Sequence, residues 1–136
     1  MRTRNSLTGQ DAGEIMQACK EEARRNRWNV SIAVVDEAGY LIHLERLDGA
    51  GLQTPEIATL KASTAALSRF STKSLEDMLT ERPSLGRLPR RLPLQGGLPI
   101  LFHGELVGAL GVSGVKSEQD EQVGAAGLAR FHALNP

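Results

Sequence analysis

The chain has 136 residues, of which 40% are hydrophobic and 24% charged, and its 16 basic residues balance its 16 acidic ones. This length fits a single domain, residues 1–136, with one core. The zero formal charge argues against a nucleic-acid-binding protein, which needs a basic face, and the 4% aromatic content leaves few rings for base stacking. A lone cysteine, Cys19, cannot form an internal disulfide.

The N-terminal sequence MRTRNSLTGQDAGE is polar and lacks the apolar stretch of a secretion signal. No segment reaches the roughly 20 apolar residues of a membrane-spanning helix. We therefore expect a cytoplasmic protein without a membrane partner. A net charge near zero gives weak electrostatic protection against self-association, which favours a homo-oligomer.

Residues 8–25 have the pattern of a first helix, in which Thr8 and Asp11 have the spacing of a capping box. Cys19 belongs to the apolar face of this helix, so we interpret it as a small core side chain rather than as a reactive thiol. The apolar positions recur at helical spacing, at Ala12, Ile15, Met16, Cys19 and Ala23.

Residues 29–47 alternate like a β-hairpin, and the turn sequence DEAG supplies Gly39 for a positive-φ position. On the return strand, His43 and Glu45 share one face. This placement favours His43 as a residue at a pocket rim or a subunit interface.

Residues 54–69 are predicted to form a helix that starts at Thr54, with Pro55 in its first turn. Lys61 lies at the margin of its apolar face, where the ammonium points either into a cleft or out to solvent. A short helix at about 73–80 follows. Residues 81–99 hold four of the six prolines and read as a long loop with a short strand at about 91–94.

Residues 98–113 form a second predicted hairpin, with HGE at its turn. The last helix is expected to begin at Ser117, with Asp120 as its capping-box partner. The element order is α-β-β-α-α-β-β-β-α. Hairpin connections predict an α+β fold with a mainly antiparallel sheet of about five strands, covered by helices in a profilin-like or PAS-like arrangement.

A small anionic ligand could bind at the glycine-rich segment before the second hairpin. Glycines there permit close backbone approach and leave amide groups free to donate, and Lys61 would add a cation. The loop 81–99 is rich in arginine, and its Arg91 adds a guanidinium whose planar shape suits carboxylates. The predicted ligand-binding residues are Gln95, Gly96, Gly97, Ser113 and Arg91.

Three acidic residues at the start of the last helix have two interpretations. Glu118, Asp120 and Glu121 compensate the helix dipole, or one of them serves with Lys61 as a proton-transferring catalytic group. The acids would also compete with an anionic ligand for the same amides. We therefore place the anion nearer to Gly96 and Gly97. No metal site is predicted.

Three segments, VSIAVVDEAGYLIHLERLDGA, IATLKASTAALSRFST and LPLQGGLPILFHGELVGALGVSGVKSEQDEQVGAAG, together resemble the GlcG/HbpS-type, haem-degrading family. The C-terminal domain of PduO proteins is similar. The resemblance runs from about Val30 to Gly127. It implies binding of haem or another tetrapyrrole, with haem degradation as an activity, and assembly into dimers or larger oligomers.

Two other functions remain open from the sequence. One is an enzyme of the isomerase, lyase or tautomerase type that acts on a small anionic metabolite, and the other is an oligomeric accessory protein without catalysis. Whether the chain is an enzyme therefore stays undecided at this point. If haem binds, His43 is the predicted cofactor ligand, because His103 lies in a turn and His132 lies near the chain end.

Overall fold

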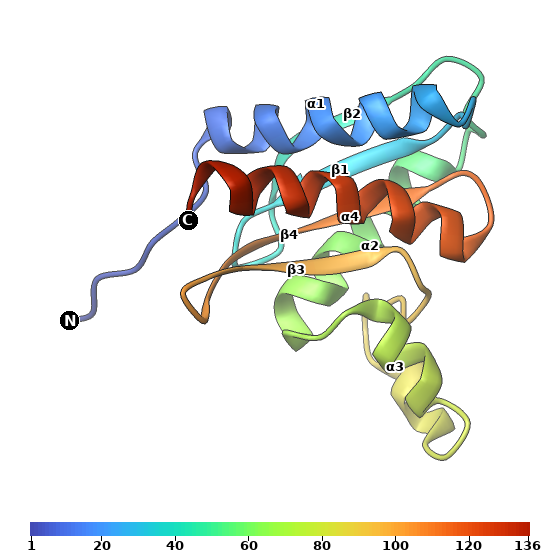
Figure 1. Ribbon diagram of the computed structural model, residues 1–136. Helices are drawn as coiled ribbons and strands as arrows, with labels where there is room; N and C mark the ends of the chain where they lie inside the picture. The colour runs from blue at the N-terminus through green and yellow to red at the C-terminus, as the bar shows by residue number, and fades with distance from the viewer.

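The computed structural model describes residues 1–136, which form one antiparallel sheet with helices on both of its faces (Figure 1). The elements in chain order are α1 (Gly9–Arg25), β1 (Ser31–Val35), β2 (Leu41–Arg46), α2 (Thr54–Ser68), α3 (Thr72–Met78), a 3₁₀ turn (Pro83–Arg87), β3 (Gly97–Phe102), β4 (Glu105–Ser113) and α4 (Ser117–Leu134).

The sheet has four strands in the order β2-β1-β4-β3, and every neighbouring pair is antiparallel. The predicted α+β class with its two hairpins is confirmed. The strand expected at 91–94 does not form. Pro89 and Pro93 have no N–H for a ladder, and the amide of Leu92 donates instead to the Thr64 hydroxyl at 2.8 Å.

Helices α1 and α4 lie side by side over one face of the sheet (Figure 1). Thr8 and Asp11 form the expected capping box at the start of α1. The predicted apolar face of α1 is buried here, and Cys19 is fully enclosed. The main core contains Ile15, Met16, Cys19, Val30, Ile32, Val34, Ile100, Leu110, Val112, Val123 and Phe131 among its buried side chains.

Helix α2 covers the opposite face of the sheet through small side chains, chiefly Ala58, Ala62 and Ala65, which pack on β1 and β4. Gly111 of β4 makes this close packing possible. A Cβ at Gly111 would collide with the carbonyl of Ala58 and the amide of Ala62. The glycine spacing of β4 therefore reflects contact between helix and sheet.

The start of α4 differs from the expected capping box. Lys116 precedes the helix, and Ser117 is already inside it. The amide of Lys116 donates to the side chain of Gln119 at 3.3 Å. Asp120 is buried and does not cap the Ser117 backbone; its carboxylate contacts Lys61 and the Val115 amide instead.

Candidate functional site

A buried ion pair joins α2 to α4 near the end of β4. The Lys61 ammonium lies 3.0 Å from a carboxylate oxygen of Asp120, and the two side chains are 1% and 3% exposed. Lys61 also donates to the carbonyl of Val112 at 2.9 Å, and the second Asp120 oxygen accepts from the Val115 amide at 3.1 Å. Lys61 therefore points neither into an open cleft nor out to solvent.

Gly96 lies directly against this ion pair, so it is close to Lys61 as the sequence predicted. Its φ is +132°, and a Cβ there would be 2.8 Å from the Lys61 ammonium and 2.7 Å from the Val112 carbonyl. Gly96 and Gly97 are buried, and the amide of Gly97 donates to the Thr72 hydroxyl at 2.8 Å. The expectation of an exposed amide at Gly97 is therefore wrong, because that donor is already used inside the protein.

Burial raises the pKa of the Asp120 carboxyl, and the attraction of Lys61 opposes this rise. Neither side chain lines any of the hollows of the molecule, and the ammonium donates to the Asp120 carboxylate and to the Val112 carbonyl. Its arrangement is that of a structural link between three elements, in which each charge supplies the counter-charge that the other needs when buried.

The remaining predicted residues do not gather into one cleft. Gln95 donates to the Glu121 carboxylate at 3.0 Å, and Glu121 directly follows Asp120 of the ion pair. Ser113 is buried on β4, and Glu118 is exposed. Arg91 lies elsewhere, at a shallow hollow of about 160 Å³ whose lining residues are Ala38, Gly39, Tyr40, Leu60, Ser63, Leu67, Arg90 and Arg91.

The three histidines have different surroundings. His132 shares a 3.0 Å hydrogen bond with the Leu101 carbonyl, and His103 is exposed in the turn between β3 and β4. His43 is half-buried on the edge strand β2, where it pairs with Val34 and so faces the α1 side of the sheet. Its ring makes no hydrogen bond within the protein. A Lys20–Glu45 ion pair of 2.7 Å lies next to it along the strand.

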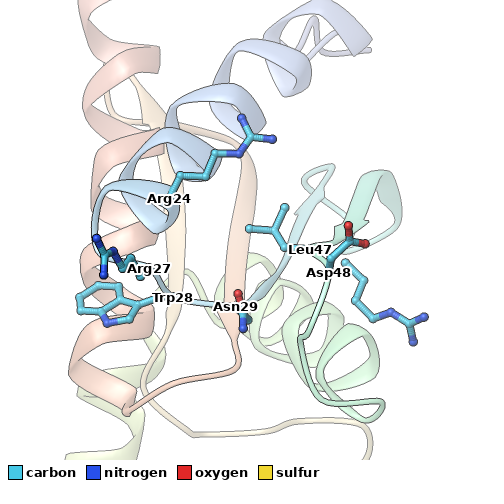
Figure 2. Close-up of a pocket in the computed structure, with 7 residues that line it drawn as sticks. Arg24, Arg27, Trp28, Asn29, Leu47 and Asp48 are labelled. Atoms are coloured by element: carbon cyan, nitrogen blue, oxygen red, sulfur yellow. The ribbon is translucent and has the colours of Figure 1, made fainter.

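The largest hollow of the molecule lies where α1 ends and β2 ends, and the sequence reasoning missed it. It has a volume of about 420 Å³, and its lining residues are Arg24, Arg27, Trp28, Asn29, Arg46, Leu47 and Asp48. Figure 2 shows Arg27 and Trp28 together on one side of it, and Leu47 and Asp48 on the other. The sequence RRNRWN, with the only tryptophan among basic residues, is the signal that could have found it.

No group of three or more histidine, cysteine, aspartate or glutamate side chains is arranged to hold a metal ion. None of the helices combines the length and apolar character needed to cross a membrane.

Comparison with known proteins decides the family. The family model described as "Haem degrading protein HbpS-like" matches residues 7–129. The chain belongs to the HbpS-like family. Protein GlcG of Escherichia coli K12 is 42% identical over 114 residues, which cover 83% of this chain and 85% of GlcG. The family predicted from the three sequence segments is therefore confirmed.

Solved structures of HbpS-like proteins share the fold. The crystal structure of HbpS matches with a TM-score of 0.91 and 37% identity, over 95% of this chain and 92% of HbpS. A crystal structure described as a complex of PduOC with haem matches with a TM-score of 0.85 and 26% identity, over 92% of this chain and 94% of the other. The match to HbpS-like folds thus extends over both faces of the sheet.

Proposed function

We propose that this HbpS-like protein binds haem or a related tetrapyrrole on its surface, with His43 as the iron ligand. The observation that carries the proposal is the similarity over 92% of the chain to a structure described as a haem complex. The family description, which names haem degradation, supports the same ligand class.

A surface position follows from how the interior is filled. Packed side chains fill both faces of the sheet, and every hollow is open to solvent, with a largest volume of about 420 Å³. The Lys61–Asp120 pair adds no ligand space, because both of its side chains are buried and hydrogen-bonded. A macrocycle would therefore lie against the outside of the molecule.

The edge strand β2 offers the groups that haem needs. His43 has a ring free of internal hydrogen bonds. The partly buried side chains of Ile42 on β2 and of Leu47 directly after it provide apolar contact nearby. Imidazole is a common axial ligand, and apolar side chains suit the face of the macrocycle.

Bound haem would supply redox chemistry at its iron, which degradation of the macrocycle requires. The contribution of this chain is to hold the ring at the sheet edge and to place His43. None of the predicted catalytic residues lies on β2: they are Lys61, Glu118, Asp120 and Glu121. In this proposal, Lys61 and Asp120 stabilise the fold and take no part in the reaction.

A titration with hemin tests the proposal. The Soret absorbance of the intact protein should saturate near one haem per chain, and His43→Ala should weaken binding and shift the Soret maximum. His103→Ala is the matched control, since His103 is an exposed turn histidine and should leave both readings unchanged. Absorbance that rises without saturation near the protein concentration, or a shift with His103→Ala instead, would refute it.

A further inference from the structure

The hollow at the end of α1 carries more positive charge than its surroundings compensate. Arg24, Arg27 and Arg46 line it, and none of the three forms an ion pair within the protein. The single acid in the lining is Asp48, which leaves a formal charge of +2 around the hollow. Neighbouring Arg25, by contrast, is held by Glu22 at 2.6 Å and does not line the hollow.

Arg27 occupies a backbone position that favours glycine. Its φ is +59°, and the amides of Arg27 and Trp28 donate to the carbonyls of Arg24 and Ala23. This is the hydrogen-bond pattern of a Schellman motif, in which the residue corresponding to Arg27 is usually glycine. An arginine there adopts a less favourable conformation than glycine would, and it places a guanidinium beside the hollow.

The motif also reduces the repulsion that an anion would meet from unpaired carbonyl oxygens at a helix C-terminus. The carbonyls of Ala23 and Arg24 are occupied by the amides of the motif, and the Glu22 carbonyl accepts from the Asn26 side chain at 2.8 Å. Few bare carbonyl oxygens therefore face the hollow.

We propose that the hollow bounded by Arg24, Arg27, Arg46 and Trp28 binds carboxylate groups attached to an apolar body. Guanidinium groups match the planar geometry of a carboxylate, while the Trp28 indole and the Leu47 side chain offer an apolar surface for the rest of the ligand. Figure 2 shows the indole on one side of the hollow and Leu47 on the other.

Two sources can supply such a carboxylate. One is a free small carboxylate, and the other is the propionate side chains of a haem held on β2, in which case the inference rests on the proposed function. Leu47, directly after β2, follows His43 by four residues, a span of about 13 Å at the rise of a β-strand. The arms of the experiment separate these two sources.

The experiment compares two variants of equal net charge. Arg24→Gln/Arg27→Gly removes two guanidinium groups from the hollow, and glycine at position 27 keeps Tm unchanged or raises it because the backbone strain is relieved. Arg25→Gln/Arg130→Gln removes two guanidinium groups that are ion-paired elsewhere, with Glu22 and Glu14. Both variants and the wild type are titrated with hemin, hemin dimethyl ester, benzoate and succinate.

Soret absorbance follows hemin, and the fluorescence of Trp28, the only tryptophan, follows benzoate and succinate. If propionates are the source, hemin binding weakens by about tenfold or more in the hollow variant alone, and the esterified hemin binds all three proteins equally weakly. If a free carboxylate is the source, benzoate or succinate changes Trp28 fluorescence saturably in the wild type and the control, and not in the hollow variant.

The results also separate this inference from the proposed function. Equal hemin affinity in all three proteins, together with no saturable response of Trp28 to either carboxylate, overturns the inference while haem binding stands. A saturable carboxylate response in a protein that does not bind hemin supports the inference and refutes the proposed function. If the wild type binds neither hemin nor a carboxylate, both the inference and the proposed function are overturned.

Discussion

Removing one charge of the Lys61–Asp120 pair should destabilise the protein strongly, whereas removing both should not. Lys61→Met leaves the Asp120 carboxylate buried without a cation, because the two side chains are only 1% and 3% exposed. Breaking a buried ion pair on one side costs about 3–5 kcal/mol. The double variant Lys61→Met/Asp120→Asn removes both charges and keeps an oxygen to accept from the Val115 amide.

The size of the loss can be converted to a shift in Tm. An unfolding entropy of about 2.1 cal/mol/K per residue gives about 0.29 kcal/mol/K for a chain of 136 residues. A loss of 3–5 kcal/mol therefore lowers Tm by about 10–17 °C in Lys61→Met. The double variant should recover most of this loss, since uncharged replacements of a buried pair are often neutral.

The loss should also depend on pH with a definite sign. Burial raises the pKa of Asp120 in the folded protein above its ordinary value of 3.8. A carboxyl with a raised folded pKa contributes most stability below its unfolded pKa, and this contribution is lost as pH rises through the folded pKa. Without Lys61 the carboxylate has no cation, so the destabilisation by Lys61→Met should be larger at pH 7.5 than at pH 5.

Thermal unfolding followed by circular dichroism at both pH values measures these effects. Lys73→Met/Asp77→Asn is the control, because its side chains are 44% and 60% exposed, and it should barely change Tm. If Lys61→Met lowers Tm no more than the exposed control, or if the double variant is as unstable as the single one, the structural role of the buried pair is wrong.

Two further changes test the packing. Gly111→Ala should lower stability by about 1–3 kcal/mol in urea unfolding, because its Cβ meets the Ala58 backbone, whereas Gly13→Ala, with open space at the Cβ position, should raise it by about 0.5–1 kcal/mol. Equal effects at the two sites would contradict the packing of α2 on β4. Burial raises the pKa of the Cys19 thiol to about 12, so a thiol reagent should label Cys19 only after denaturation, and rapid labelling of the folded protein would show that α1 and α4 open readily.

The sequence predicted best what depends on neighbouring residues. The capping box of Thr8 and Asp11 and the apolar face of α1 follow from local spacing, and both are present. The strand expected near residues 91–94 did not form, because Pro93 within the run and Pro89 just before it leave few amides to join a sheet. Local patterns cannot show whether an amide such as that of Leu92 finds a side-chain partner elsewhere.

The candidate site was harder to predict, because its parts come together only in the folded chain. Lys61 and Asp120 are 59 residues apart in sequence, and each has a local interpretation, as a solvent-facing lysine or a helix-starting acid, that hides their pairing. The hollow beside Trp28 lies between the end of α1 and the end of β2. Its arginines come together only in the folded chain, so no local pattern predicts the whole cluster.

Mapping a diamagnetic haem analogue onto the protein tests the central claim most directly. Gallium protoporphyrin IX can be titrated into isotope-labelled protein while the backbone amide resonances are followed by NMR. The account predicts saturable shifts concentrated on strand β2, around His43, with further shifts at the adjoining end of α1. Shifts concentrated on α3 or on the turn between β3 and β4, or no saturable shifts at all, would contradict it.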